Sequence, residues 1–240
     1  MQTSFFKSAH RLSLASIICI GITISCYLLE MIYNLIFITY FPHLGDSENL
    51  TESELVMSLA ALGLIVVKVV AYIASIVFFL MWLYRAYKNL EALKIRNLDS
   101  SAGWAVGYWF IPIVNLFKPF KIVSEVYNGS DPEIAKAGYG FSDTTTTSTI
   151  GFWWACWVFS NIASRIASGI EKAAKDVTET SVMVYVVALA LGIMAGILLI
   201  FIIRDIDSRQ AECERLLSIQ QPPRPPVFNQ PDFNPPHQTF

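Results

Sequence analysis

Four long apolar runs are the feature that most restricts how this chain can fold, and they cover residues 12–41, 55–84, 150–169 and 181–203. An α-helix rises 1.5 Å per residue, so about 20 residues cross the hydrocarbon core of a bilayer, which is roughly 30 Å thick. Each run is long enough to form a transmembrane helix. We therefore predict an all-α membrane protein built on a four-transmembrane-helix bundle.

The composition supports this class and argues against several others. Hydrophobic residues make up 54% of the chain and charged residues 15%, whereas soluble domains carry roughly 25% charged residues. The net charge is −2, and the basic residues are sorted between apolar runs instead of forming one stripe, so nucleic-acid binding is not expected. The four cysteines have neither a disulfide-like nor a zinc-like spacing, and we expect no metal or cofactor.

The charged residues between the runs orient the predicted helices. Residues 42–54 are acidic and contain no Lys or Arg, whereas residues 1–11 and 85–101 are basic. Because basic residues flanking membrane helices favour the cytoplasmic side, we place both termini in the cytoplasm.

The predicted order along the chain follows from this orientation. It consists of a cytoplasmic N-terminus (1–11), a first span (12–41), an extracytoplasmic acidic loop (42–54), a second span (55–84), a basic cytoplasmic helix (85–101), an apolar segment (102–127), a cytoplasmic loop (128–149), a third span (150–169), an extracytoplasmic loop (170–180), a fourth span (181–203), a cytoplasmic helix (204–219) and a disordered proline-rich tail (220–240).

The apolar segment 102–127 is too interrupted to be an ordinary span. Pro112 and Pro119 each remove a backbone donor, and Asn115 and Lys118 break its second half. With four spans the segment must begin and end in the cytoplasm, and a fifth span would carry the later basic residues outside. We therefore predict a re-entrant or interfacial apolar helical segment between spans two and three, with a five-span layout as the alternative.

Ionisable side chains inside the predicted spans are the sharpest candidates for function. Glu30, Lys68 and Arg165 each cost at least a few kcal/mol in hydrocarbon unless they face a partner or water. Our hypothesis is that Glu30 bridges Lys68 or Arg165 between neighbouring spans. An ion pair that only fixes helix packing is the simplest interpretation, and a solute, ion or proton pathway or snorkelling to an interface are the alternatives. Asn34, Asn115 and Asn161 are candidates for interhelical hydrogen bonds, for which a role in helix packing is the simplest interpretation.

Basic residues after the second span are candidates for contact with anionic lipid headgroups. A Lys or Arg close to an anionic bilayer surface contributes about 1 kcal/mol of attraction. The candidates are Arg85, Lys88, Lys94 and Arg96.

One segment carries a specific resemblance. It reads WLYRAYKNLEALKIRNLDSSAGWAVGYWFIPIVNLFKPFKIVSEVY from Trp82 to Tyr127, and GFWWACWVFSNIASRI follows later. The pattern closely resembles a bacterial multipass membrane family catalogued as domain of unknown function number four-three-two-eight. The motif residues that we single out are Arg85, Asn89, Gly103, Trp104, Gly107, Trp109, Pro112, Asn115, Lys118 and Pro119. The resemblance implies a polytopic bacterial membrane protein and brings no established activity with it.

This chain departs from the family pattern at one turn. Ser101-Ala102-Gly103 stands where the family usually has Ser-Pro-Gly, so the turn is less rigid.

No catalytic constellation is visible in the sequence. All three histidines lie in flanks or tail, and there is no nucleophile motif or phosphate loop. We predict a non-enzymatic scaffold or regulator of the bacterial inner membrane, whose cytoplasmic face contacts lipid headgroups, a protein partner or a second copy of itself. The alternative is an oligomeric channel or small-solute transporter with Lys68, Arg165 and Asn115 on its path, and an intramembrane enzyme is the third possibility.

Overall fold

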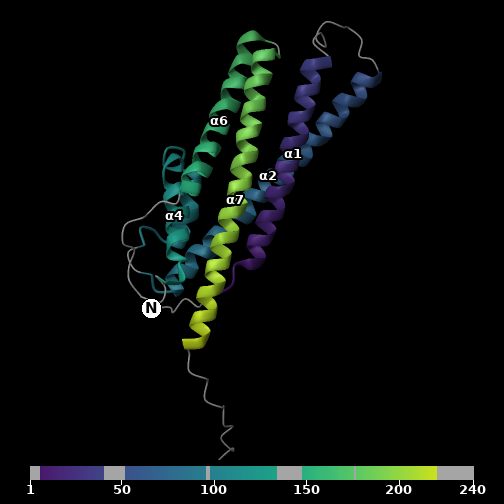
Figure 1. The fold of residues 1–240 in the computed structure, drawn as a ribbon. Coiled ribbons are helices and arrows are strands. Elements are labelled where there is room, and N and C mark those ends of the chain that lie inside the picture. The colour runs from purple at the N-terminus through teal and green to yellow at the C-terminus, as the bar shows by residue number, and fades with distance from the viewer. Residues whose placement is uncertain (1–5, 41–51, 96–97, 134–147, 176, 221–240) are drawn as a thin grey trace, which may run out of the picture.

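The computed structural model describes residues 6–40, 52–95, 98–133, 148–175 and 177–220, and every regular element within these ranges is helical. The all-α prediction is therefore confirmed for the described part of the chain. Its frame consists of four long helices, which are α1 (His10–Tyr40), α2 (Glu52–Ala92), α6 (Ser148–Ala174) and α7 (Glu179–Gln220) (Figure 1). Residues 42–51 of the predicted loop 42–54, Arg96, most of the predicted loop 128–149 and the proline-rich tail lie outside the described residues, and α2 begins at Glu52, inside the predicted loop.

Three helices in the described part are long and apolar enough to cross a membrane. They comprise His10–Ile36, Leu59–Ala92 and Glu179–Ile219, in α1, α2 and α7. The predicted third span falls in α6, a helix of 27 residues that is not among them. Length and apolar composition thus define a membrane protein.

Three helices extend beyond the ends that we predicted for their spans, and α6 continues to Ala174, five residues past the predicted end at 169. The predicted cytoplasmic helix 204–219 is the continuous end of α7, and the predicted basic helix 85–101 is not a separate helix, because α2 runs on to Ala92. The turn after α2 is closed by hydrogen bonds from the Leu93 and Ile95 amides to carbonyls of Asn89 and Leu90, with Lys94 in the left-handed region at φ 58°. Leu90 and Leu93 are buried, so tertiary packing sustains the helix past the apolar run.

The long helices form two antiparallel pairs that meet where α1 contacts α7 (Figure 1). Glycines on α7 allow this approach. A Cβ atom on Gly196 would lie 2.9 Å from Ile24, and one on Gly192 would lie 3.0 Å from the ring of Tyr27. The small residues of α7 therefore join helices within one chain.

The segment between the two pairs is a compact turn of short helices. It contains α3 (Ala102–Gly107), η1 (Tyr108–Phe110), η2 (Val114–Leu116) and α4 (Lys118–Gly129). Pro112 lies between η1 and η2, and Pro119 occupies the first turn of α4, where a missing N–H costs nothing.

Both ends of this segment lie close to the end of α2. The Tyr87 hydroxyl donates a hydrogen bond to the Ser100 carbonyl, and Gln210 links Ser130 to the Ala86 carbonyl. Between these ends, Trp109 reaches the Phe79 ring, with centroids 5.2 Å apart. Phe79 precedes Tyr87 by eight residues, or about 12 Å of helix, so the segment rises along α2 and returns.

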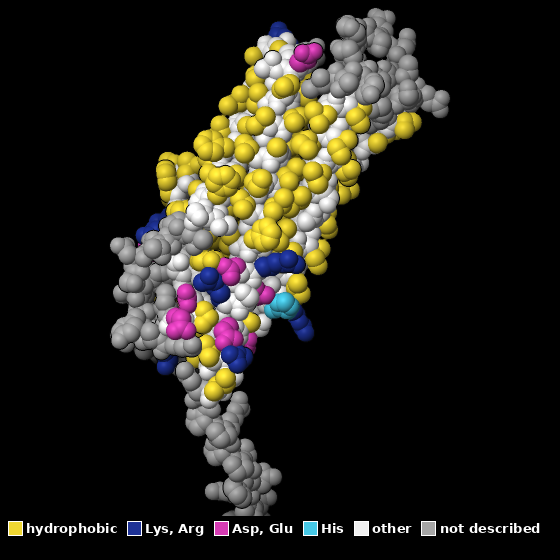
Figure 2. Space-filling model, in the orientation of Figure 1, with side chains coloured by type: hydrophobic (Ala, Val, Ile, Leu, Met, Phe, Trp, Pro, Cys, Tyr) yellow, Lys and Arg dark blue, Asp and Glu magenta, His cyan; other side chains and the backbone are white. Residues whose placement is uncertain are grey.

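Burial and charge divide the molecule into two ends. The basal end comprises the start of α1, α4 and the C-terminal ends of α2 and α7. The apical end comprises the end of α1 and the ends of α6 and α7 that face one another. Charged side chains gather at the basal end, below a broad apolar surface (Figure 2). Large side chains that are less than 2% exposed, such as Trp82, Tyr87 and Leu90, come from the basal part of α2.

Candidate functional site

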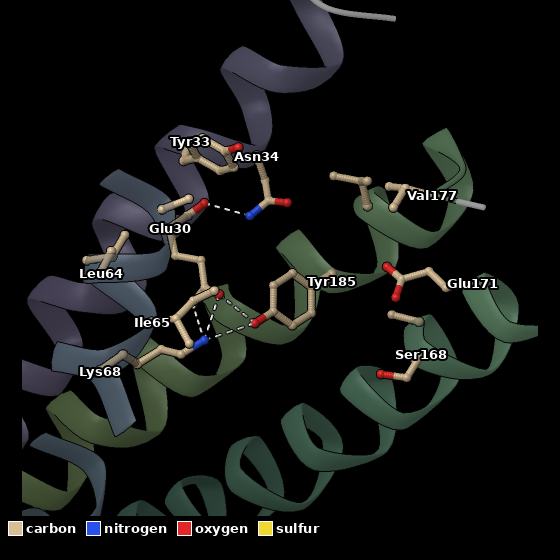
Figure 3. A pocket seen from close by; sticks show the side chains of 13 residues that line it. Glu30, Tyr33, Asn34, Leu64, Ile65, Lys68, Ser168, Glu171, Val177 and Tyr185 are labelled. Carbon is tan, nitrogen blue, oxygen red and sulfur yellow. Dashed lines mark hydrogen bonds and ion pairs between the residues drawn. The ribbon is translucent and has the colours of Figure 1, made fainter. Parts of the chain in front are cut away.

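A cluster of three polar side chains joins α1, α2 and α7 near the apical end (Figure 3). Lys68 Nζ donates hydrogen bonds to both Glu30 carboxylate oxygens, at 2.7 and 2.9 Å, and the Tyr185 hydroxyl donates to Glu30 Oε1 at 2.8 Å. The side chains of Lys68 and Glu30 are 18% and 13% exposed. The predicted contact between Glu30 and Lys68 is thus present, and Tyr185 completes it.

The cluster forms part of the wall of a cavity of about 460 Å³ between the two helix pairs. Figure 3 shows Ser168 and Glu171 of α6 across from Glu30 and Lys68. Lys68 precedes Arg85 by 17 residues on α2, which is about 25 Å along the helix axis, so the cluster is well separated from the basal end. The lining residues are Glu30, Tyr33, Asn34, Ala61, Leu64, Ile65, Lys68, Ala167, Ser168, Glu171, Val177, Val182 and Tyr185.

Other polar residues predicted for the membrane interior do not act as expected. Arg165 is exposed on α6 and forms no ion pair with a described residue. Asn34 and Asn161 donate to the carbonyls of Glu30 and Trp157, one turn earlier in their own helices. The prediction of interhelical hydrogen bonds from these two residues is wrong, because the carbonyl at position i−4 is the nearest acceptor for a short side chain in a helix.

A second cavity of about 400 Å³ lies further toward the basal end, and on α2 its lining begins at Tyr72, about one helical turn after Lys68. Tyr27 and Tyr72 form part of its lining, as do Trp109 and Asn115 from the middle segment. Trp109 also packs edge-on against Trp154 and Trp157 of α6. The motif residues Trp109 and Asn115 therefore contribute to a cavity that sequence reasoning did not predict.

A buried hydrogen-bond network closes the basal end around the motif residue Asn89, which is 1% exposed. Asn89 donates to Gln210 Oε1 at 2.8 Å and accepts from the Lys7 amide at 3.2 Å. Gln210 in turn donates to the Ala86 carbonyl and to the Ser130 hydroxyl. Four segments that are distant in sequence are thereby connected through two side chains.

A second basal contact holds the middle segment to α2. Glu125 of α4 is 5% exposed and accepts hydrogen bonds from the Tyr87 hydroxyl at 2.9 Å and the Asp99 amide at 2.6 Å. Burial raises the pKa of the Glu125 carboxyl, and the two donors partly offset this change. The Lys121 ammonium beside Asp99 lowers the pKa of the Asp99 carboxyl.

The remaining motif residues lie around this basal structure. Trp104 is 56% exposed and stacks on Tyr108, and Lys118 Nζ lies 5.3 Å from the centre of the Tyr108 ring. The Ser101 hydroxyl accepts a long 3.5 Å hydrogen bond from the Trp104 amide, and Gly107 lies against the Trp104 ring. Gly103 has open space where a Cβ would be, so nothing here requires glycine.

The predicted headgroup candidates lie at the basal end of the apolar surface. Arg85 and Lys88 are half-buried, Lys88 Nζ lies 5.7 Å from the Tyr84 ring centre, and Lys94 is exposed. None of the three forms an ion pair with a described residue, and Arg96 lies outside the described part.

Three residues of these networks were missed by sequence reasoning: Tyr185, Glu125 and Gln210. Glu125 offered a usable signal, as the lone acidic residue between apolar positions of KPFKIVSEVY. Tyr185 and Gln210 gave none, because a tyrosine in a span and a glutamine in a polar helix are ordinary there.

The fold defines a helical membrane protein in which a short-helix segment is clamped between two antiparallel helix pairs. Its sequence matches the family described as a domain of unknown function (DUF4328) over residues 47–208. The chain therefore belongs to this family. No curated protein and no solved structure matches the chain.

Proposed function

We propose that this protein is a four-span protein of the bacterial inner membrane, with both termini in the cytoplasm. In this proposal it acts as a non-enzymatic scaffold or regulator through its basal surface. The observation that carries the proposal is a set of basic side chains at the basal end that form no ion pair with a described acidic residue.

The position of α6 supports a fourth span. It begins at Ser148 near α4 and runs antiparallel alongside α7 to the apical end (Figure 1). If α7 crosses the bilayer, the chain needs α6 to reach the apical side. Arg165 faces outward at a depth where its long side chain reaches toward an interface.

The contacts of the middle segment support its return to the cytoplasmic side. Ser100 and Ser130, which flank the segment, contact the same turn of α2 directly or through Gln210. The tip is apolar and exposed, with Phe110 and Phe117 each 71% exposed and Ile113 77% exposed. Such a tip is favourable in hydrocarbon and costly in water, which supports a re-entrant segment in the inner leaflet.

The basal cations separate into a paired and an unpaired group. Arg209 and Arg215 form ion pairs with acidic residues of α7. The cations that surround the end of the apolar surface have no ion pair with a described residue and are free to meet lipid phosphate. They are Arg11, Arg85, Lys88, Lys94, Lys118 and Arg204.

Vesicle binding of the purified protein tests this function. Arg85, Lys88 and Lys94 are replaced together by Gln, and the preference for phosphatidylglycerol over phosphatidylcholine is measured by exchange of a labelled lipid. We expect a loss of about 3 kcal/mol, or roughly 100-fold, from about 1 kcal/mol per charge. The paired residue Arg215→Gln serves as the control. An unchanged preference in the triple variant would remove the physical basis of the proposal.

Labelling tests the layout independently. A thiol reagent that does not cross membranes is applied to intact cells that carry Lys121→Cys in a variant without the four native cysteines. We expect no reaction until the cells are opened. Reaction in intact cells would place α4 outside and overturn the four-span layout.

The alternative is a channel or small-solute transporter, and the two cavities on adjacent turns of the same helices favour it. Against it, Arg165 lines neither cavity, and Lys68 and Asn115 line different ones. Solute flux into liposomes that contain the purified protein separates the two functions. Flux that is abolished by Lys68→Met would favour transport.

A further inference from the structure

The second cavity is open to the membrane side of the molecule. Its lining comes from all four long helices and from the middle segment. Among its lining residues, Ile76 and Phe110 are 39% and 71% exposed on the apolar surface, and Asn161 is exposed as well. A molecule in this cavity would therefore enter from the hydrocarbon of the bilayer, which makes a lipid the natural occupant.

None of the described residues that line the cavity is charged, so the bound part of the lipid must be neutral. A charged group buried there would lose its hydration without gaining a partner. The nearby ion pair of Glu30 and Lys68 offers none, because its charges are satisfied by one another and by Tyr185.

Several polar groups of the lining have no hydrogen-bond partner in the described structure. The hydroxyls of Tyr27 and Tyr72 make no hydrogen bond with a described residue, and the Tyr27 hydroxyl is not fully covered by surrounding atoms. The indole N–H of Trp109 and the Oδ1 atom of Asn115 are also unpaired but are covered by neighbours. Unpaired buried polar groups are rare in folded proteins and costly.

These groups specify the chemistry of a ligand. Three of them are donors, which call for acceptors such as ester carbonyls, and Asn115 Oδ1 calls for a hydroxyl. The Tyr27 hydroxyl is accessible without rearrangement, whereas pairing with Trp109 and Asn115 requires neighbouring side chains to move. The volume of about 400 Å³ is near the lower end of small-molecule sites, roughly 300–1,000 Å³. A cavity of this volume is large enough for a glycerol with its ester groups, provided that the acyl chains stay in the bilayer.

We propose that the second cavity is a binding site for a neutral glycerolipid of the diacylglycerol class, held by its ester carbonyls at Tyr27 and Tyr72. This site is independent of the headgroup contacts proposed for the basal surface. Its polar groups and its opening lie on the membrane-facing part of the molecule, away from the unpaired basal cations.

Tryptophan fluorescence tests the site, because Trp109, Trp153 and Trp157 all line the cavity. The purified full-length protein in neutral detergent is titrated with diacylglycerol that carries brominated acyl chains, which quench nearby indoles. We expect saturable quenching that unlabelled dioleoylglycerol reverses. The dialkyl ether analogue, which lacks both carbonyls, should compete at least about tenfold more weakly, as should phosphatidylglycerol.

A pair of variants locates the site. Tyr27→Phe combined with Tyr72→Phe removes only two oxygen atoms and should weaken binding about tenfold. Tyr84→Phe is the matched control, because Tyr84 is an exposed tyrosine of α2 outside the cavity lining, and it should bind normally. Quenching that rises without saturation, equal competition by the ether analogue, or an unaffected double variant would each overturn the proposal. If the double variant does not fold, the ether comparison on the native protein decides.

Discussion

The basal and apical parts of the molecule bury polar groups in different ways. At the basal end, Asn89, Gln210 and Glu125 are each at most 5% exposed and connect segments from the whole chain. Toward the apical end, the helices expose most of their apolar side chains, and one ion-pair cluster joins α1, α2 and α7. The basal end is therefore a core that defines one arrangement, whereas the membrane-facing part depends on lipid to cover it.

The largest effect is expected from breaking the basal network. Gln210→Ala leaves the Asn89 amide without its acceptor and removes a donor from the Ala86 carbonyl and from the Ser130 hydroxyl, which keeps its bond to the Val126 carbonyl. We expect a loss of about 3–4 kcal/mol in the free energy of unfolding, measured by thermal unfolding in detergent. Ser208→Ala, on the exposed face of α7, should change stability by less than about 0.5 kcal/mol. Similar losses of stability in the two variants would contradict the prediction that the basal network contributes more to stability than an exposed hydroxyl group does.

The apical cluster should give the next largest effect. Lys68→Met leaves Glu30 charged and partly buried, with Tyr185 as its remaining partner, and we expect a loss of about 2–3 kcal/mol. Adding Glu30→Gln should recover about half of it, because the unpaired charge is then removed. A double-mutant cycle measures this coupling. A double variant that loses the sum of the two single losses would show that the pair does not couple.

The contact between the helix pairs gives a medium effect. Gly196→Ala places a Cβ atom 2.9 Å from Ile24, and we expect a loss of about 1–3 kcal/mol from overpacking. Gly63→Ala on α2 has nothing within 4 Å and should be neutral or stabilising by up to about 1 kcal/mol. Equal unfolding temperatures for the two variants would show that α1 and α7 separate without strain.

Two lysines allow the same backbone change to be compared at both ends. Lys94 at the basal end and Lys175 at the apical end have φ values of 58° and 61°, which glycine adopts without a steric penalty. Lys94→Gly and Lys175→Gly should each stabilise the protein by about 1 kcal/mol. A loss of stability in the Lys94 variant alone would reveal a basal contact of its side chain.

The smallest effect is expected from titration of Glu125. Burial raises its carboxyl pKa from the ordinary 4.5, so the folded protein binds this proton more strongly than the unfolded chain does. Its contribution to stability is therefore fully present below pH 4.5 and is lost as the pH rises through the raised value. Unfolding temperatures from pH 4 to 7 should show native stability falling relative to Glu125→Gln. The exposed Glu214→Gln serves as the control, and its profile of stability against pH should run parallel to that of the native protein. A Glu125→Gln profile that also runs parallel to the native one would contradict the prediction.

Sequence reasoning succeeded where the free-energy cost of burying a side chain depends only on the residues around it in the sequence. A charge inside an apolar run requires a partner wherever the run packs, and this was enough to predict that Glu30 pairs with Lys68 or Arg165, of which Lys68 is the one that it contacts. The helical class follows in the same way from the length of the apolar runs.

Sequence reasoning did not identify partners that only tertiary structure brings together. Tyr185 is 155 residues from Glu30, and Gln210 is 124 residues from the carbonyl of Ala86. The ends of α2 and α7 were also misplaced, because composition marks where a helix leaves the apolar region and not where its hydrogen bonds end. The cavities arise from the angle between helix pairs, which no local pattern encodes.

The unbroken length of α7 has a mechanical consequence. Its 42 residues carry Tyr185 in the membrane-facing part and Gln210 in the basal core on one stiff rod. A rotation of this rod that withdraws Tyr185 from Glu30 must also turn Gln210 away from Asn89. A change at the contact between Tyr185 and Glu30 is therefore coupled to the basal network, because α7 has no break between the two contacts that could absorb the movement.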